Sequence, residues 1–275
     1  MPLLIILHHY YLGSTKPEQY YRSGFFYAII HYMKILQLNV WMGKVEGTLR
    51  RFLENNDFDV ICMQEIFASD NCAGHLSRLC FDREQIQKAS RLPYAFFSPN
   101  WSSEIAGGTF EEGNLILSRI PFAETHSEFI SGEHKEKMIL GEVVGNNLNL
   151  QIAKLENGLT VINHHGFWRP NPIGDEESVR AFTKVGNIVR QVPGPLVMCG
   201  DLNVIHDSPA MRPLDFLRDL TQEYDVETTL SGLKFDGKVA CDHILVNDGI
   251  DVQDFAVLPD LVSDHLALTA EIELH

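Results

Sequence analysis

Short apolar runs that end in polar residues constrain the fold of this chain most strongly. In the stretch VMCGDLNV, the apolar run Val197–Cys199 meets Gly200, and Asp201 and Asn203 then follow two positions apart. Such a run is typical of a buried strand. Because a strand points residues i and i+2 to the same face, we expect the side chains of Asp201 and Asn203 to lie on one side of the sheet.

Further strands and helices alternate along the chain from Met33 onwards. Strand patterns occupy residues 34–40, 59–63, 113–118, 138–155, 158–163, 242–246 and 266–274, and helical patterns occupy 45–56, 68–90, 176–192 and 209–220. The dipeptides Asn146–Asn147 and Asn157–Gly158 are suited to hairpin turns. Hairpins mixed with strand–helix–strand units predict one layered α/β domain with mixed sheets over residues 33–275.

Polar residues of a few kinds recur at the ends of these strands. They are Asn39, Glu65, His165, Asp201, Asn203, Asp242, Asp264 and His265. Each alone reads most simply as a turn or structural residue, but independent turn residues would not supply a whole hydrolytic site. Mg²⁺ prefers carboxylate and amide oxygens, so Glu65 and Asn39 are candidate ligands. An ion held there would polarise a phosphoryl oxygen.

The residues of the VMCGDLNV stretch fit the hydrolysis of a phosphoester. Of Asp201 and Asn203, one can orient or deprotonate an attacking water while the other donates a hydrogen bond to a phosphate oxygen. His165 can stabilise charge on the phosphoryl oxygens.

A second histidine completes the candidate site. His265 can serve as an acid–base group or as a donor to phosphate, and it needs a carboxylate that fixes its tautomer. Asp242, on the preceding strand, is the natural partner, and Asp264 could support a second metal ion.

Charge and cysteine content limit the partners and the compartment. The formal net charge is -15, from 22 basic and 37 acidic residues. This charge disfavours extended, sequence-independent binding to a nucleic-acid backbone. The five cysteines show no CxxC pair and are expected to be free thiols in a reducing, cytoplasmic compartment. No run of residues reaches the length of a transmembrane segment. We expect a monomer.

Residues 1–32 differ from the rest of the chain. They hold six of the eight tyrosines and a single acidic residue, Glu18. The segment lacks the features of a secretory signal. Three interpretations compete: a translated region upstream of a true start at Met33, an interfacial membrane anchor, or an added structural element. We favour the first.

Seven blocks of the sequence resemble the endonuclease/exonuclease/phosphatase superfamily. In order, the blocks are LQLNV at 36–40, DVICMQE at 59–65, GNLILSR at 113–119, VINHH at 161–165, GDLN at 200–203, CDHILV at 241–246 and SDH at 263–265. That superfamily includes DNase I-like nucleases, abasic-site endonucleases, neutral sphingomyelinases and inositol polyphosphate phosphatases. The resemblance covers residues 33–275.

The resemblance implies a fold and a reaction. The fold is a four-layer α-β-β-α sandwich with two mixed, mainly antiparallel sheets, and the reaction is Mg²⁺- or Mn²⁺-dependent cleavage of a phosphoester by an activated water. It assigns Asn39 and Glu65 to the metal, with Asp264 near the metal or its waters.

The resemblance also implies roles for the other site residues. It assigns Asp201 and Asn203 to water and phosphate, and it places His265, held by Asp242, opposite His165. It leaves open which of Asp201 and His265 is the general base. The block at 113–119 resembles a structural strand of the family, so Asn114 is expected to be non-catalytic.

One block departs from the family pattern. His164 precedes His165 where the family has a small residue, so either histidine is a candidate. Phe167, Trp168 and Arg169 follow, where they would lie near the mouth of the site. Packing is the simpler role for these aromatic residues, but Trp168, with Arg169 and Arg180, is a candidate for binding substrate.

Three functions remain open from the sequence. The first is an active metal-dependent phosphodiesterase, nuclease or phosphatase, for which no site position is broken. The second is a binding protein that kept the fold without its chemistry. The third is a membrane-associated lipid phosphodiesterase of the sphingomyelinase type, anchored through residues 1–32. Whether the substrate is a nucleic acid or a small molecule is undecided.

Overall fold

A computed structural model describes most of the chain. The described residues are 32–69, 81–105, 108–136, 147–234 and 237–275, together with the backbone of 20–23 and 26–29. The chain divides into two units, Met1–His31 and Tyr32–His275. In the first unit, strands β1 (Tyr20–Ser23) and β2 (Phe26–Ile29) pair antiparallel. The interpretation of residues 1–32 stays a prediction, because most of them lie outside the described residues.

The second unit contains two sheets of six strands each. The first sheet has the order β13 (Ile250–Leu258), β14 (Ala267–Leu274), β3 (Met33–Asn39), β4 (Val60–Ser69), β6 (Gly108–Ser118), β5 (Tyr94–Ile105). The second has the order β11 (Arg218–Asp219), β12 (Asp242–Val246), β10 (Leu196–Asp201), β9 (Thr160–His164), β8 (Leu148–Leu155), β7 (Phe122–Ser131). Among the described strands, β3 pairs with β4 and β9 with β10 in parallel, and the other neighbours are antiparallel.

Each parallel pair is joined by a helix that covers its sheet. Helix α1 (Glu46–Asn55) joins β3 to β4 and buries Leu49, Phe52 and Leu53. Helix α3 (Glu176–Val189) joins β9 to β10 and buries Phe182. It is capped by Asp175, whose side chain accepts hydrogen bonds from the first turn. The shorter elements are α2 (Arg83–Ser90), α4 (Leu220–Glu223) and the 3₁₀ helices η1 (Trp41–Gly43) and η2 (Pro209–Leu214).

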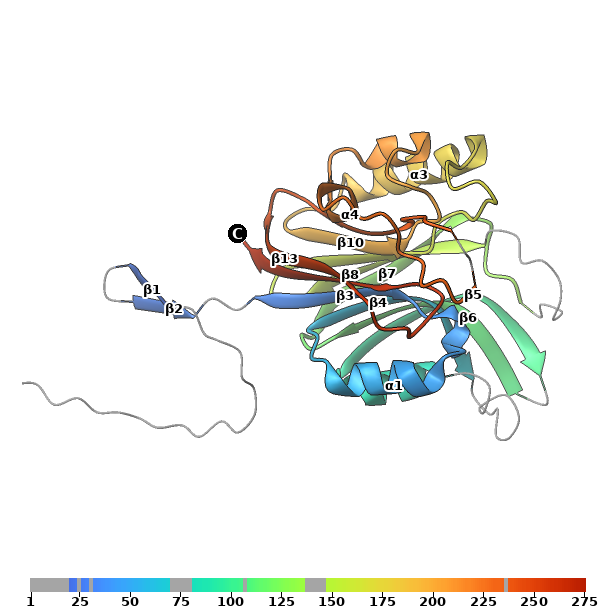
Figure 1. Cartoon of the computed structure of the whole chain (residues 1–275), viewed down its shortest axis with the longest axis horizontal. Helices are drawn as coiled ribbons and strands as arrows, with labels where there is room; N and C mark the ends of the chain where they lie inside the picture. The colour runs from blue at the N-terminus through green and yellow to red at the C-terminus, as the bar shows by residue number, and fades with distance from the viewer. Residues whose placement is uncertain are drawn as a thin grey trace, which may run out of the picture. The chain divides into compact units, whose positions relative to one another are not determined.

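Three apolar cores define the layers. One lies between α1 and the first sheet, one between α3 and the second sheet, and the third lies between the two sheets, where Cys62 and Cys199 are both fully buried. Figure 1 shows α1 and α3 on opposite outer faces with the sheets between them. This arrangement confirms the predicted four-layer α-β-β-α sandwich.

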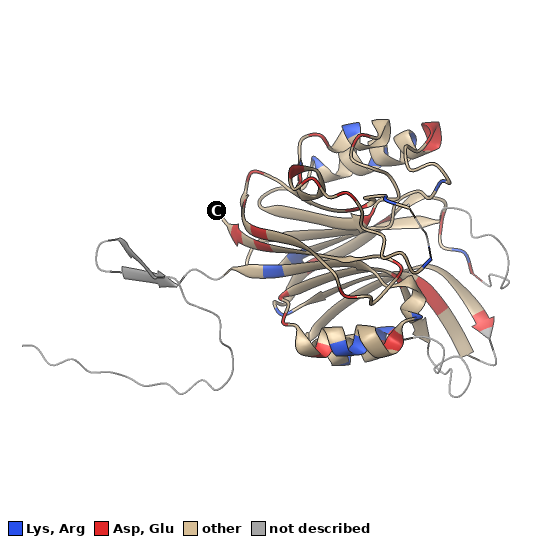
Figure 2. Ribbon diagram, in the orientation of Figure 1, with Lys and Arg blue, Asp and Glu red and all other residues tan. Residues whose placement is uncertain are grey.

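Charged side chains are concentrated on the outside of this sandwich. Figure 2 shows the Lys, Arg, Asp and Glu residues mainly on the outer helices and the loops. In the part of the chain that the structure describes, no helix is long and apolar enough to cross a membrane.

Several elements differ from those predicted from the sequence. Strand β4 continues to Ser69 instead of ending near residue 63. A helix was predicted over residues 68–90, and the helix that the structure describes in this range is α2, Arg83–Ser90. The predicted helix at 209–220 is a 3₁₀ helix over Pro209–Leu214, with Pro213 inside it. Residues 137–146 of the predicted strand region 138–155 lie outside the described residues. Strands β5, β7 and β13 were missed by the sequence patterns.

Buried amides connect the two sheets across the central core. Gln37 Nε2 on β3 donates to Gln64 Oε1 on β4 at 2.7 Å, and Gln64 Nε2 donates to Asn163 Oδ1 on β9 at 2.7 Å. Asn163 Nδ2 in turn donates to Gln151 Oε1 on β8 at 3.0 Å. Gln37 Nε2 also lies 3.3 Å from Asp242 Oδ1 on β12. We call Gln37, Gln64, Asn163 and Gln151 the amide seam.

Candidate active site

The two sheets present the ends of their parallel strands at one edge of the sandwich. Asn39 ends β3, Asp201 ends β10, and His165 directly follows β9. Strand β12 runs antiparallel to β10, so its first residue, Asp242, pairs with Asp201. Residues that are distant in the sequence are therefore neighbours at this edge.

Asp201 lies at the centre of the cluster, with only 1% of its surface exposed. Its Oδ2 accepts a hydrogen bond from Asn39 Nδ2 at 2.9 Å, and it lies 3.6 Å from His165 Nε2 and 3.7 Å from His265 Nε2. Burial by itself raises the pKa of Asp201, but the two histidines and the hydrogen bonds from Asn39 and the Asn203 amide hold this pKa below its ordinary value. The carboxylate is thus kept ionised.

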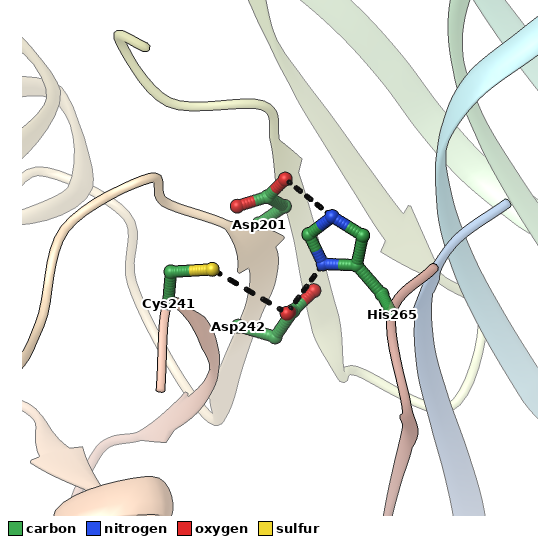
Figure 3. A group of neighbouring side chains, drawn as sticks. All are labelled: Asp201, Cys241, Asp242 and His265. Atoms are coloured by element: carbon green, nitrogen blue, oxygen red, sulfur yellow. Dashed lines mark hydrogen bonds and ion pairs between the residues drawn. The ribbon is translucent and has the colours of Figure 1, made fainter. Parts of the chain in front are cut away.

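His265 and Asp242 form a buried pair beside Asp201 (Figure 3). His265 Nδ1 lies 2.8 Å from Asp242 Oδ2, and Nε2 faces Asp201. Asp242 also accepts a hydrogen bond from Thr229 Oγ1 at 2.6 Å. Burial lowers the pKa of His265, but Asp242 and Asp201 together raise it well above its ordinary value. The raised pKa favours the protonated imidazole, whose Nε2 lies toward Asp201.

Asn203 reaches the cluster through a turn, not through the alternation of a strand. Strand β10 ends at Asp201, and Asn203 has a left-handed backbone with φ of 57°. Its backbone N–H donates to Asp201 Oδ1 at 3.0 Å, and its Nδ2 donates to the Gly166 carbonyl at 3.1 Å. Leu202 is fully buried in the core below α3. Asn203 thus faces the site for a different reason from the one predicted.

Glu65 lies at an irregularity within a strand, where a strand end was predicted. The pairing of β4 with β6 shifts register between Met63 and Ile66, and Glu65 has a φ of 56°. Asn39 Nδ2 donates to Glu65 Oε1 at 3.3 Å, while Asn39 Oδ1 accepts from the Trp41 backbone N–H at 3.0 Å. Asn39 thus bridges the carboxylates of Glu65 and Asp201, and because an amide oxygen can accept at two positions, its role as a metal ligand stays a prediction.

Asp264 is buried with a lysine against it. Its Oδ2 lies 3.4 Å from Lys234 Nζ, and its Oδ1 accepts from Ser263 Oγ at 3.2 Å. His265 Nε2 is 4.0 Å from Asp264 Oδ1. The Lys234 ammonium also lies over the Trp41 ring, 5.7 Å from its centroid.

The two adjacent histidines point in different directions. His164 is 1% exposed, its Nδ1 lies 3.0 Å from the Asn149 carbonyl, and its ring lies 6.1 Å from that of Phe182. Burial lowers the pKa of His164 to about 4. His165 is half-buried and faces the cluster. Of the two candidates, the structure brings only His165 to the site.

The three candidate substrate-binding residues have different positions. Trp168 is 57% exposed beside the cluster. Arg169 also lines the site, where it lies over the Phe167 ring and binds the carboxylates of Asp175, at 2.5 Å, and Glu177. Arg180 lies on α3 beside glutamates of that helix and does not line the site.

Two cavities meet at this edge of the sandwich. The central cavity has a volume of about 250 Å³ and the side cavity a volume of about 230 Å³. Both are lined by Glu65, His165 and Trp168. The central cavity adds Asp201, Asn203 and His265, whereas the side cavity adds Asn100, Trp101 and Glu112.

Sequence reasoning missed several residues of these cavities, among them Glu112, Lys234 and Cys241. It also missed Thr229, which donates a hydrogen bond to Asp242. Burial raises the pKa of the Glu112 carboxyl to about 7, with Glu65 adding to this effect and His165 opposing it. Cys241 directly precedes Asp242, which was the only signal available for it. Glu112 stands next to Glu111 in the sequence, and such a pair resembles an ordinary solvated strand face.

The donor groups of the site fit a metal ion. The side chains of Asp201, Cys241, Asp242 and His265 are buried and offer ligand atoms within 4.8 Å of one another. Glu65 and Asp264 add oxygen donors at the same edge. Carboxylate oxygens are the ligands that Mg²⁺ and Mn²⁺ prefer, whereas a buried thiol is not.

Comparisons with solved structures define the class of this fold. The endonuclease/exonuclease/phosphatase from Beutenbergia cavernae is 16% identical, with a TM-score of 0.64 over 88% of this chain and 72% of that chain. The catalytic domain of human Nocturnin with bound sulfate is 16% identical, with a TM-score of 0.62 over 89% and 95%. The mannosyl-6-phosphatase of Bacteroides thetaiotaomicron is 17% identical, with a TM-score of 0.59 over 87% and 99%. No curated protein matches the sequence.

The fold and the carboxylate–histidine cluster together define a phosphoester hydrolase. The sequence matches the Endonuclease/Exonuclease/phosphatase family over residues 36–265, which is most of the chain. The chain belongs to this family, as its seven sequence blocks predicted.

Proposed function

We propose that this chain is a Mg²⁺- or Mn²⁺-dependent hydrolase that cleaves a phosphoester by attack of an activated water. The observation that carries the proposal is the convergence of Glu65, His165, Asp201, Asn203 and His265 on one cavity. These are the groups that such a reaction requires: a metal ligand, a group that positions water, and donors to the phosphoryl oxygens.

Asp201 and His265 have complementary roles in this proposal. Asp201 is ionised and accepts hydrogen bonds on both oxygens, so it can orient a water molecule and accept its proton. His265 is held by Asp242 with its Nε2 toward the cavity, where it can donate to a phosphoryl oxygen or to the leaving oxygen. The directions of the two pKa shifts favour Asp201 as the base and His265 as the donor.

Three other residues position the phosphate and the metal ion. Glu65 is the carboxylate that would hold a hard divalent cation, and Asp264 would supply a second carboxylate. Bound there, the ion would polarise a phosphoryl oxygen and neutralise charge in the transition state. His165, which lines both cavities and whose Nε2 lies 3.6 Å from Asp201 Oδ2, can donate to the phosphoryl group.

The cellular compartment of the protein and the class of its substrate are also proposals. The three described cysteines, Cys62, Cys199 and Cys241, are buried free thiols. This supports a reducing, cytoplasmic compartment. The substrate is a phosphoester of a nucleic acid or of a small molecule.

A substrate panel with magnesium tests the proposed function. It contains plasmid DNA, abasic duplex, single-stranded RNA, sphingomyelin, inositol phosphates, sugar phosphates and a generic phosphodiester. We expect hydrolysis of at least one member that excess EDTA abolishes and Mg²⁺ restores. Full activity in EDTA would contradict the metal mechanism.

Two variants locate that mechanism in the site. Asp201→Asn should lower kcat by about 10²- to 10⁴-fold, while Asp254→Asn, an exposed aspartate on β13, serves as the matched control. Glu65→Gln should raise the Mg²⁺ concentration needed for half-maximal activity. An unchanged magnesium titration would remove Glu65 from the set of ligands.

A further inference from the structure

The side cavity is a recess whose own residues Asn100, Trp101 and Glu112 have no role in the proposed reaction. Its walls come from η1, β4, β5, β6, the start of β8 and the loop after β9, and it opens beside the catalytic cluster. Its lining includes Glu65, Asn100, Trp101, Glu112, His165 and Trp168. Because the two cavities share Glu65, His165 and Trp168, a molecule with its phosphate in the central cavity can extend directly into the side cavity.

A fixed carboxyl group lies in this recess. Glu112 is 9% exposed, and Asn100 Nδ2 donates to its Oε2 at 3.4 Å. The Trp101 side chain, whose only donor is the indole N–H, also hydrogen-bonds it. Asn100 is itself held, since its Oδ1 accepts from the Asn149 backbone N–H at 3.2 Å and from Asn149 Nδ2 at 2.8 Å. In its ionised form, which prevails above its pKa of about 7, the carboxylate has about four acceptor positions, so these two donors leave Glu112 able to accept from a ligand.

The chemistry of the lining selects the kind of group that fits. The described residues that line the side cavity include no lysine or arginine, and two of them, Glu65 and Glu112, are acidic. A second phosphate or a carboxylate would meet no fixed cation in this recess. Trp101, Trp168, Met42 and Leu148 supply aromatic and apolar walls, against which the carbon face of a ring can pack. Walls of this kind around one carboxyl acceptor suit a ring that carries hydroxyl groups.

We propose that the side cavity binds the alcohol portion of the substrate, as an uncharged ring that carries hydroxyl groups, with Glu112 as the acceptor that selects it. A sugar or a cyclitol has this chemistry. The inference rests on the proposed function, because it assumes that the central cavity holds the phosphate. A volume of about 230 Å³ accommodates one such ring and not a long chain.

The test measures binding without turnover. The full-length chain in EDTA is titrated by calorimetry with glucose 6-phosphate, ribose 5-phosphate and inositol 1-phosphate. Cyclohexylmethyl phosphate, a ring without hydroxyl groups, phosphocholine and inorganic phosphate are the comparison ligands. We expect at least one hydroxylated ring phosphate to bind about 10- to 100-fold more tightly than cyclohexylmethyl phosphate, the range expected from one hydrogen bond to a charged group.

Two variants connect this selectivity to the side cavity. Glu112→Gln should reduce the preference for the hydroxylated ring at least about 10-fold, whereas Glu111→Gln, the half-buried neighbour on the same strand, should leave it unchanged. Trp168→Ala changes an exposed side chain and so avoids a folding defect. Because Trp168 lines both cavities, its replacement should weaken binding of every ring phosphate by a larger factor than binding of inorganic phosphate.

Different results overturn the inference and the proposed function. Equal affinity for the hydroxylated and plain rings overturns the inference. The inference also fails if phosphocholine binds most tightly of all the ligands and this binding is lost in Glu112→Gln, because the recess would then select a cation. Selective binding without hydrolysis of any substrate overturns the proposed function alone. Hydrolysis of the panel without ring selectivity overturns the inference alone.

Discussion

Two buried histidine–carboxylate pairs lie in the second half of this chain, and only one of them faces a cavity. In each pair, Nδ1 of the histidine is 2.8 Å from an aspartate Oδ2: His265 with Asp242, and His243 with Asp219. His265 is 7% exposed and lines the central cavity, whereas His243 is fully buried. The distance from Nδ1 to the aspartate oxygen is the same in both pairs and does not distinguish them.

The difference between the pairs lies in the second ring nitrogen. His243 Nε2 is 2.9 Å from the Val204 carbonyl oxygen, so both of its nitrogens are bound within the protein. His265 Nε2 instead lies toward Asp201 and the cavity. Burial lowers the pKa of both histidines, yet their aspartates raise it more in each case. A buried histidine is therefore available for chemistry only when its second nitrogen has no structural partner.

Loss of the cavity-facing histidine should have the largest effect on activity. His265→Gln should lower kcat/KM by about 10²- to 10⁴-fold, because the donor to the phosphoryl group is lost. Asp242 keeps its hydrogen bonds from Thr229 and Gln37, so the free energy of unfolding should fall less than in His243→Gln. Steady-state kinetics and urea denaturation measure the two effects. A variant with wild-type kcat/KM would place His265 outside the mechanism.

Loss of the enclosed histidine should instead lower stability. His243→Gln leaves the buried carboxylate of Asp219 with the Thr221 backbone N–H as its described partner. Removing one partner of a buried ion pair costs about 3–5 kcal/mol of unfolding free energy. Activity per folded molecule should stay within about twofold of wild type, since His243 is not among the residues that line the central cavity. If urea denaturation shows no loss, the pair contributes nothing to the fold.

The two aspartates should affect the pH dependence of catalysis differently. Asp242→Asn removes a negative charge that raises the pKa of His265, so the alkaline limb of the kcat profile should move to lower pH by about one unit or more. Asp219→Asn should leave this limb in place, because Asp219 contacts His243 and not His265. Profiles that shift equally in both variants would show that the two pairs are not independent.

The smallest expected effect is on the pH dependence of stability. The pKa of His243 is raised in the folded state, so the folded protein binds this proton more tightly than the unfolded chain does. The pair then contributes its full stability below about pH 6.5, and that contribution is lost as the pH rises through the folded-state pKa. The difference in unfolding free energy between wild type and His243→Gln should therefore decrease above pH 6.5. A difference that grows with pH would contradict a raised pKa.

The sequence was sufficient to predict the strands that carry the cluster. The apolar run before Asp201 and the run before Glu65 both form strands that are buried on both faces, where patterns are strongest. The helices α1 and α3 were predicted because their apolar residues recur at helical spacing. Strands β5 and β7 were missed because β7 exposes polar residues on an outer strand and β5 contains Pro99, which interrupts a strand pattern.

The site was less completely predictable. Asn203 and Glu65 both have left-handed backbones, a conformation that no periodicity indicates. The Lys234–Asp264 contact depends on how a loop folds over the site, and nothing in the sequence near Lys234 indicates this. Glu112 enters the side cavity because β6 turns that side chain inward and Glu111 outward, and adjacent glutamates do not reveal which one is buried.

The amide seam has a consequence for how the two sheets recognise each other. An apolar interface alone would tolerate many ways of docking one sheet on the other, because dispersion and burial carry no direction. Gln37, Gln64, Asn163 and Gln151 are satisfied only when each donor faces one particular acceptor. The seam therefore selects a single alignment, and in that alignment Asp242 meets Gln37 while His265 meets Asp201. The edge where the cluster forms is thus set in the middle of the molecule, by side chains that never contact a substrate.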